Sequence, residues 1–545
     1  MKLRRAGLYF HTLRYLRPTQ VWGRVAFRLV RHAPDLRPAP PARQSSGVWR
    51  VPAARQPSML SPVRFRFLSV ERTLKTVDDW DPSQSSRLWT YNLHYFDDLN
   101  ARSAYQRRDW HRALMDRWIA ENPPGNGPGW EPYPLSLRIV NWIKWALAGN
   151  ALDDNAHHSL AVQVRYLAGR LERHLLGNHL FANAKALVFA GCYFDGIEAA
   201  GWMHCGMDIL AQQIPEQILA DGGHFERSTM YHALAYEDLL DLTNVGAAFP
   251  QAMKSWIDTT VSWRPVIARM GRWLAAMCHP DGEIGFFNDA ATGIAPAPSD
   301  LFAYALRLDH EVPAIDQDVV WLDGSGYIRL RLGRAVMLID VAPLGPDYLP
   351  AHGHADTLSF ELSLDEQRVI VNSGTSRYGL GPEREWERAT AAHSTVEVDG
   401  QNSSEVWSDF RVARRARPFA VAIRKADAAI FVEAAHDGYR RLSGRAVHRR
   451  AWRLEPGGLT IRDEVIGRHA SAVARYYFHP LIAIQPQDGH GRLNWNGATA
   501  DYSVDTGSAR LKKAYYAPAF GARVDNSCLE LRETGGRMAL ALYWS

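Results

Sequence analysis

Residues 326–343, GYIRLRLGRAVMLIDVAP, mark the point where the hydrophobic pattern of the chain changes. Apolar residues here alternate with polar ones or form short runs between turn residues, which is typical of strands. The pattern continues through TLSFELSLDEQRVIVNSG, FAVAIRKADAAIFVEAAH and AVARYYFHP. Many such strands, separated by Gly, Asp and Pro turns, predict an antiparallel β-sandwich over residues 321–545.

The pattern before residue 320 is helical. Apolar residues recur every three or four positions in DWHRALMDRWIAENP, LSLRIVNWIKWALAGN, DNAHHSLAVQVRYLAGRLERHLLG and TMYHALAYEDLLDLTNVG, and each run ends near Gly, Pro or Asn. Successive helices with short connections predict helical hairpins, either stacked as a solenoid or closed into a toroid. We therefore expect a helical domain over residues 63–320, in front of the β-domain.

The first 62 residues differ from both domains. Residues 1–34 are basic and amphipathic, without the apolar core and cleavage site of a signal peptide, and the expected location is the cytoplasm, with the periplasm as the alternative. We expect a helix docked on the main domain here, although the Arg and aromatic pattern could also touch a membrane surface. Residues 36–62 are rich in Pro, Ala, Arg and Ser and predict a linker or a surface strap. The chain contains no apolar stretch of transmembrane length.

Composition limits the classes of partner. A chain of 545 residues is too long for one ordinary hydrophobic core, so two or three domains are expected. With 63 Lys+Arg against 58 Asp+Glu, the net positive charge is too small to indicate nucleic-acid binding. This balance still allows a local basic cleft for an acidic substrate. The 19 Trp and 21 Tyr would suit a carbohydrate groove, although ordinary core packing explains most of them. The composition does not indicate an oligomeric state.

The stretch AHGHAD places His352, His354 and Asp356 within five residues. Side chains two positions apart share a face of an extended segment, so these three could converge on one point. Such a cluster suits a metal site or a proton-transfer site. The alternative is a polar strand end whose histidines face solvent.

Several motifs, in a consistent order along the chain, resemble those of the heparinase II/III-type polysaccharide lyases. They are LGNHLFANAKAL, DGGHFERSTMYH, HGHADTLSF, VNSGTSRYG and AHSTV, and the upstream TYNLHYFDDL and EPYPLSLRIVNWIKW resemble members found with exopolysaccharide clusters. The resemblance implies an (α/α) toroid packed on an antiparallel β-sandwich, which agrees with the periodicity. It also implies β-elimination on a uronic-acid-containing polysaccharide, without an organic cofactor.

This reaction requires an enzyme to neutralise the uronate carboxylate, remove the C5 proton and protonate the departing O4. The resemblance implies Asn178 as the carboxylate neutraliser, with Tyr231 and His352 sharing the base and acid roles. Asn178 could instead cap a helix, and Tyr231 could be a core residue. A free Tyr titrates at about pH 10, so a nearby cation or imidazolium would be needed to lower the pKa of Tyr231. We expect Arg227, four residues before Tyr231, to lie on the same helical face.

The remaining candidates would bind substrate or metal. The substrate-binding candidates are His179, His224, Glu226, Arg227, Arg377, Tyr378, Arg384 and Trp386. The resemblance places His354 and His393 at metal-ligand positions, while Asn372 stands where a related enzyme has an aspartate. A neutral amide is a weaker zinc ligand than a carboxylate, and Asp356 could supply the missing charge. A structural divalent ion (zinc or calcium) and a metal-free hydrogen-bond cluster are both open, and either would hold the loop that carries His352.

Two other functions compete with the lyase. A glycoside hydrolase on a helical toroid would use two carboxylates, with Glu226, Asp221 and Asp289 as candidates. A non-catalytic glycan-binding or exopolysaccharide-synthesis accessory protein could retain the same fold. Ultraviolet absorbance distinguishes elimination from hydrolysis, because only elimination creates a C4–C5 double bond conjugated with the carboxylate.

Overall fold

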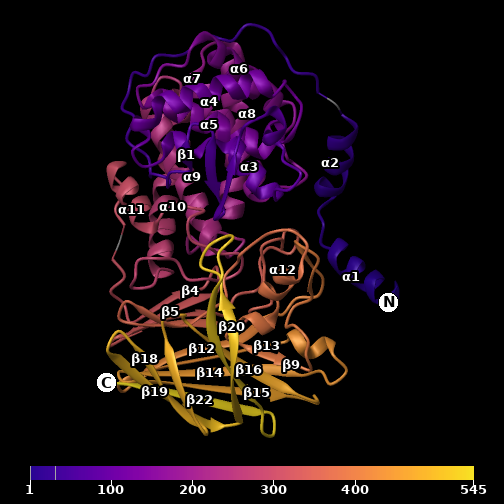
Figure 1. The fold of residues 1–545 in the computed structure, drawn as a ribbon, viewed down its shortest axis with the longest axis vertical. Helices are drawn as coiled ribbons and strands as arrows, with labels where there is room; N and C mark the ends of the chain where they lie inside the picture. Colours follow the sequence, from indigo (N-terminus) through magenta and orange to yellow (C-terminus); the bar gives the residue numbers. More distant parts are fainter. Residues whose placement is uncertain (1, 31, 313) are drawn as a thin grey trace.

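Two domains are stacked along the long axis of the molecule (Figure 1). The computed structural model describes residues 2–30, 32–312 and 314–545. Helices fill one half, two large antiparallel sheets fill the other, and two N-terminal helices lie along one edge. The prediction of a helical domain followed by an antiparallel β-domain is therefore confirmed.

The helical domain is organised around one buried helix, α7. Its helices are α3 (Arg87–Tyr95), α4 (Arg108–Glu121), α5 (Pro132–Leu147), α6 (Asp154–Ala168), α7 (Gly177–Tyr193), α8 (Ile197–Gln217), α9 (Thr229–Ala248), α10 (Ile257–Ala276) and α11 (Pro298–Arg307). Nearly every residue of α7 is buried, and α7 packs against α5, α8 and α9. Its approach to α8 depends on a small residue, because a Cβ at Gly191 would lie 2.7 Å from the Cβ of Met203.

The predicted helix over residues 154–177 is wrong at its C-terminal end. Helix α6 stops at Ala168, and the chain turns before α7 begins at Gly177. Side chains hold this turn: the amide nitrogen of Glu172 donates to Oδ1 of Asn183 at 2.8 Å, and Nδ2 of Asn183 donates to the Glu172 carboxylate at 3.1 Å. These tertiary hydrogen bonds override the local helical periodicity and place the start of α7 at the interface between the domains.

The β-domain consists of two facing antiparallel sheets. One has the order β20-β21-β16-β8-β7-β6-β5-β4, with β9 also paired to β16, and the other has the order β12-β13-β14-β15-β22-β19-β18-β17. The strands of the first sheet are β4 (Val319–Leu322), β5 (Tyr327–Leu332), β6 (Ala335–Asp340), β7 (Phe360–Leu364), β8 (Gln367–Val371), β9 (Val396–Val398), β16 (Ala472–Phe478), β20 (Ser508–Tyr516) and β21 (Val524–Arg532). Those of the second are β12 (Pro418–Ala426), β13 (Ala429–His436), β14 (Val447–Glu455), β15 (Gly458–Ile466), β17 (Ala483–Gln487), β18 (His490–Trp495), β19 (Ala498–Thr506) and β22 (Arg537–Trp544).

Alternation along the strands explains why the two sheets pack together. On β14, Trp452 and Leu454 point into the core while Arg449 and Arg453 point outward. The ring of Trp452 contacts that of Phe360 on the other sheet, with centroids 6.4 Å apart. The shared apolar core fixes the loops at the end of the sandwich that faces the helices.

Three small elements border the space between the domains. A hairpin sheet of β1 (Met59–Ser61), β2 (Arg64–Phe67) and β3 (Val70–Thr73) crosses the predicted boundary at residue 62, where we expected a linker followed by helices. The hairpin β10 (Val406–Trp407) and β11 (Arg411–Val412) and the short helix α12 (Pro382–Glu387) extend from the β-domain.

The N-terminal segment forms two helices and a strap. Helices α1 (Lys2–Leu13) and α2 (Pro18–Leu29) dock on the edge of the molecule, and the segment after them crosses the helical domain, where Arg43 N donates to Tyr193 O at 2.7 Å. Within residues 2–30, 32–312 and 314–545, no helix combines the length and the apolar character needed to span a bilayer.

Candidate active site

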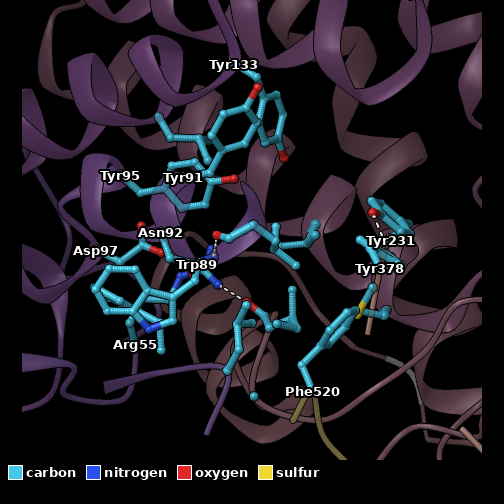
Figure 2. Close-up of a pocket in the computed structure, with 18 of the residues that line it drawn as sticks. Arg55, Trp89, Tyr91, Asn92, Tyr95, Asp97, Tyr133, Tyr231, Tyr378 and Phe520 are labelled. Carbon is cyan, nitrogen blue, oxygen red and sulfur yellow. Dashed lines mark hydrogen bonds between the residues drawn. The ribbon is translucent and has the colours of Figure 1, made fainter. Parts of the chain in front are cut away.

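A cavity of 1310 Å³ lies between the helical domain and the β-domain. Its helical wall includes Asn178 and Tyr231, and its β-domain wall includes His352 and Tyr378. Figure 2 shows Tyr231 and Tyr378 facing each other at one side of this space. The cavity is larger than typical small-molecule sites of about 300–1,000 Å³, so it suits an extended ligand.

Tyr231 and His352 meet at this interface. Ser228 caps α9 by accepting a hydrogen bond from the amide of Tyr231 at 3.1 Å, which fixes the first turn of the helix. The rings of Tyr231 and His352 lie with centroids 4.0 Å apart and planes inclined by 32°. The hydroxyl of Tyr231 is 3.1 Å from that of Tyr378. The structure thus brings together two residues that lie far apart in the sequence.

A buried carboxylate, Asp289, orients the histidines. Its two oxygens lie 2.9 Å from Nδ1 of His352 and 2.8 Å from Nε2 of His354. The fully buried guanidinium of Arg384 donates to both oxygens. Burial alone would raise the pKa of Asp289, but Arg384 and the two imidazoles hold it well below its ordinary value. With Asp289 ionised and accepting the Nδ1 proton, Nε2 of His352 is left as the proton acceptor.

His352, His354 and Asp356 do not converge as the HxHxD spacing suggested. His352 and His354 both turn toward Asp289, and the strand begins only at Phe360. Asp356 instead lies near His354 and His393. The geometry of an extended strand therefore does not apply to this loop.

The electrostatics of Tyr231 differ from the expectation. Burial raises the pKa of Tyr231 well above its ordinary value, and the neighbouring Tyr378 adds to the effect. Arg227 does not lie on the α9 face: its φ is 57°, it precedes the helix cap, and its Nε donates to the carbonyl of Ser325 at 2.8 Å. Tyr231 is therefore a neutral hydroxyl at ordinary pH, suited to donating a proton.

Glu226 presents an unusual carboxyl group beside His352. It is buried, and among the described residues neither of its oxygens has a hydrogen-bond partner. One oxygen lies 3.7 Å from Nε2 of His352. Burial raises the pKa of Glu226, which favours the protonated form.

Asn178 is the second residue of α7 and does not cap it. Leu176 occupies the cap position, with φ at 63°, so the alternative of a capping asparagine is wrong. The half-buried side chain of Asn178 lines the cavity. Its neighbour His179 also lines it, with Nδ1 3.0 Å from the Glu172 carboxylate and the ring 4.5 Å from that of Tyr133. Burial opposes a charge on His179, but Glu172 raises its pKa above the ordinary value.

The other substrate-binding candidates divide into two groups. His224, Arg377 and Tyr378 line the cavity. His224 is almost fully buried, and burial lowers its pKa to about 3. Arg384 is committed to Asp289, and Trp386 packs its ring 4.3 Å from that of Tyr515, so neither occupies the substrate-facing position that we expected.

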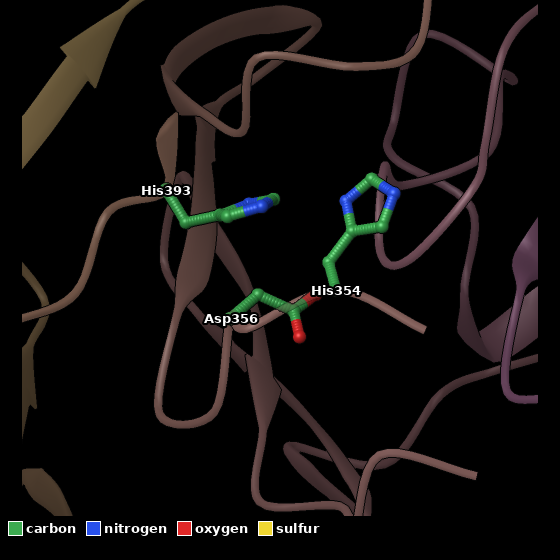
Figure 3. A group of neighbouring side chains, drawn as sticks. All are labelled: His354, Asp356 and His393. Atoms are coloured by element: carbon green, nitrogen blue, oxygen red, sulfur yellow. The ribbon is translucent and has the colours of Figure 1, made fainter. Parts of the chain in front are cut away.

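His354, Asp356 and His393 form a cluster that fits a divalent ion (Figure 3). One ligand atom from each lies within 4.8 Å of the others. Burial, followed by the nearby His354, lowers the pKa of His393 well below its ordinary value, so its ring carries one N–H. Yet both ring nitrogens face acceptors, the Glu387 carbonyl at 3.1 Å and Oδ1 of Asn372 at 3.3 Å.

A cation would resolve this mismatch. His393 can donate to only one of its two acceptors, and Nδ1 of the buried His354 has no hydrogen-bond partner within the described part of the chain. Burial also raises the pKa of Asp356, which would become less basic beside a positive ion. Asn372 lies beside the cluster, because its Oδ1 is 3.3 Å from Nδ1 of His393.

Sequence reasoning missed the role of Asp289 and one wall of the cavity. The sequence suggests Asp289 as a hydrolase carboxylate, and nothing local indicates that it joins two histidines and an arginine. The missed wall is aromatic and lies within the helical domain (Figure 2); it includes Trp89, Tyr91, Tyr95 and Tyr133. The motifs TYNLHYFDDL and EPYPLSLRIVNWIKW, which contain three of these, were the available signal.

Comparison with known sequence families assigns the chain to a class. Residues 99–300 match the family described as heparinase II/III N-terminus, and residues 314–538 match heparinase II/III-like, C-terminal. The two matches follow each other and together cover most of the chain. The chain therefore belongs to the heparinase II/III-like family.

Individual relatives are more distant. FtsZ-localized protein C of Caulobacter vibrioides is 26% identical over 409 residues, covering 72% of this chain and 66% of that protein. A heparin-sulfate lyase of Bacteroides stercoris is 26% identical over 334 residues, covering 57% of this chain and 46% of the lyase. The chain thus spans about half to two thirds of the length of the curated relatives that it matches.

Solved structures share the fold. A crystal structure of heparinase III aligns with a TM-score of 0.69 at 18% identity, covering 85% of this chain and 78% of the other. Heparan sulfate lyase HepC from Pedobacter heparinus aligns with a TM-score of 0.56 at 17% identity, covering 96% and 87%. The helical domain and the β-domain accordingly form the toroid and β-sandwich of this family.

Proposed function

We propose that the protein is a polysaccharide lyase that cleaves a uronic-acid-containing glycan by β-elimination. The observation that carries the proposal is the contact of Tyr231, from the toroid, with His352, from the β-sandwich, inside a cavity that Asn178 also lines. Membership of the heparinase II/III-like family and the three heparin-sulfate lyases among the relatives support it.

The cavity and the residues beside it offer each group that the elimination needs. Asn178 would donate its amide to the uronate carboxylate and so stabilise the charge that develops when C5 loses its proton. A protonated Glu226 would add a second neutral donor near His352. Arg377, which lines the cavity and is partly exposed, would attract the anionic chain at the entrance.

The base and acid roles follow from the protonation states. His352 has Nδ1 committed to Asp289, so Nε2 would accept the C5 proton. Tyr231 keeps its hydroxyl proton, because burial raises its pKa, and would deliver this proton to the departing O4. The C5–H and C4–O4 bonds would break, and the C4–C5 double bond would form. The C5 proton would end on Nε2 of His352, and the proton of Tyr231 would end on O4 of the departing sugar.

The side-by-side rings suggest a stereochemical preference. Tyr231 and His352 would approach the sugar from one side, so they suit a uronate whose C5 proton and O4 lie on the same face. Glucuronate and mannuronate have this arrangement, whereas their C5 epimers, iduronate and guluronate, present the two groups on opposite faces. We therefore propose a syn elimination on a gluco- or manno-configured uronate.

A structural ion is part of the proposal. His354, Asp356 and His393 would hold a divalent cation, and mixed nitrogen and oxygen ligands favour zinc over calcium. When bound, the ion would supply charge compensation and rigidity to the loop that carries His352. Asp289 would then orient the ligand His354 from behind, as carboxylates commonly do at metal sites.

The test is a panel of uronate polymers that pairs C5 epimers, such as polymannuronate against polyguluronate. The protein should generate ultraviolet-absorbing unsaturated product from at least one polymer of gluco or manno configuration. Tyr231→Phe should lower that rate by about a hundredfold or more, because it removes only the hydroxyl group that would transfer the proton. The exposed Tyr543→Phe is the matched control and should keep full activity. Normal turnover by Tyr231→Phe would refute the assignment of the acid.

The alternatives receive less support. A two-carboxylate hydrolase would need free carboxylates, but Asp221 accepts from the amide and hydroxyl of Ser325 at 2.7 Å each, and Asp289 is bound by Arg384. Sugar release without the unsaturated chromophore would favour the hydrolase. Glycan binding without any cleavage across the panel would favour a non-catalytic accessory protein.

A further inference from the structure

The N-terminal segment carries a one-sided charge. Residues 1–34 contain neither Asp nor Glu. Their basic residues are Lys2, Arg4, Arg5, Arg14, Arg17, Arg24, Arg28 and Arg31. The whole chain has a formal net charge of only +5, so the positive charge is concentrated in this segment.

Helix α2 uses one face to dock on the protein. Nε2 of the buried Gln20 donates to the carbonyl of Tyr348 at 3.1 Å. The ring of Phe27 lies 4.4 Å from that of His174, and the guanidinium of Arg170 lies over it at 4.3 Å. These contacts account for one side of α2 and leave the other side facing outward.

The outward face of α2 is an apolar stripe. Spacings of one, four and eight residues place its members on one side of a helix. They are Val21 (47% exposed), Trp22 (72%), Val25 (46%) and Leu29 (76%). Exposed Arg24 and Arg28 follow the edge of this stripe, three residues after Val21 and Val25. An exposed aromatic and aliphatic stripe of this kind indicates an interaction surface.

Helix α1 lies along the same edge of the molecule as α2 (Figure 1), and it also carries exposed apolar side chains. Its inner side is anchored on the β10–β11 hairpin, where Nε1 of Trp407 donates to Oγ1 of Thr12 at 3.1 Å. Phe10 and Leu13 of the same helix are 64% and 54% exposed. We call the exposed apolar side chains of the two helices, together with exposed Arg24 and Arg28, the α1–α2 surface; its apolar members are Phe10, Leu13, Val21, Trp22, Val25 and Leu29.

We propose that the α1–α2 surface binds the face of an anionic lipid membrane. Cationic side chains would approach the headgroups while Phe, Trp and Leu enter the boundary with the acyl chains. Each helix has 12 residues, which is shorter than the roughly 20 needed to cross a bilayer, so both would lie in the plane of the interface.

Charge distinguishes this occupant from others. A second copy of the chain would bring the same acid-free basic segments together, which like-charge repulsion opposes. An acidic glycan would pair with the arginines but would leave Val25 and Leu29 in water. An anionic surface with an apolar interior complements both the basic and the apolar side chains of the α1–α2 surface.

Vesicle sedimentation tests the proposal independently of catalysis. The full chain should bind mixed phosphatidylglycerol–phosphatidylcholine vesicles at least about tenfold more tightly than pure phosphatidylcholine vesicles, and high salt should remove this difference. Trp22→Ser combined with Leu29→Ser should weaken binding by about tenfold or more, because two exposed apolar side chains lose their insertion.

Matched controls make the outcome decisive. Trp321→Ser with Leu481→Ser changes one exposed Trp and one exposed Leu in the β-domain and should leave vesicle binding unchanged. Equal binding of both double variants, or equal binding to neutral and anionic vesicles, would overturn the proposal. Concentration-dependent dimers that the Trp22→Ser and Leu29→Ser changes abolish, without vesicle binding, would identify a second copy as the occupant and also overturn it.

Discussion

Replacing Asp289 by Asn is the sharpest perturbation of the proposed site. The change keeps the shape of the side chain and removes a carboxylate that holds His352, His354 and Arg384 at once. Arg384 is fully buried, and its remaining anionic partner is Asp409, whose oxygen lies 3.3 Å from Nε. The variant therefore leaves a buried cation with only one partial counterion.

The magnitude follows from these contacts. Breaking a buried ion pair by removing one partner costs about 3–5 kcal/mol, and the residual contact with Asp409 favours the lower end, about 3 kcal/mol. Activity should fall further than stability explains. The amide cannot accept from Nδ1 of His352 and satisfy Arg384 and His354 together, so the base loses its orientation and the rate should fall by about 10²–10⁴-fold.

Two measurements separate these effects. Urea unfolding reports the loss of stability, and the initial rate of unsaturated product reports catalysis at a temperature where the variant is folded. Asp281→Asn is the matched control, because Asp281 belongs to the same loop and pairs with Arg368 at 2.7 Å, away from His352. It should lose some stability and keep activity.

A second variant tests the reasoning from the other side. Adding Arg384→Met to Asp289→Asn removes the stranded cation, so part of the stability should return while activity stays low. If Asp289→Asn matched the activity of Asp281→Asn, Asp289 would not orient the base. If the double variant regained full activity, the effect of Asp289 would be stability alone.

Two further predictions concern Glu226 and the metal cluster. Burial raises the pKa of Glu226 above its ordinary 4.5, so ionisation of this carboxyl group destabilises the folded state. Glu226→Gln should therefore raise the melting temperature relative to wild type at neutral pH. This difference in melting temperature should disappear as the pH falls through the raised pKa to below 4.5, because wild-type Glu226 is then protonated. A gap that is independent of pH would contradict this account. Elemental analysis should find about one divalent ion per chain, and chelation should lower the melting temperature, because the ion binds only the native state. His393→Ala should abolish both the bound ion and the effect of chelation, whereas the control His469→Ala should preserve them. A metal-free wild type with unchanged melting temperature would leave the hydrogen-bond cluster as the better explanation.

The order of domains was determined by the sequence itself. Periodicity is a local property: residues within one or two turns of helix, or one strand, record which face will be buried. The change near residue 320 therefore predicted where helices would give way to strands, and α11 and β4 lie on either side of it. Local motifs also singled out Tyr231 and His352, because the resemblance rests on short contiguous stretches.

Other features were decided by tertiary contacts. Residues 169–176 have helical periodicity but turn, because Glu172 and Asn183 bond to each other across the turn. Arg227 has helical spacing to Tyr231, yet a left-handed backbone and the carbonyl of Ser325 take it elsewhere. In both cases a distant partner outweighed a local preference.

The site itself depends most on the tertiary structure. Asp289 lies in one loop, His352 and His354 lie in another, and Arg384 lies in α12, so the sequence does not show that these four residues contact one another. Their pairing, the raised pKa of Tyr231 and the exposed stripe on α2 all depend on which groups are removed from water together. Desolvation and charge pairing act through space, so the sequence identifies the chemical groups, while the packing of the two domains determines their protonation and orientation.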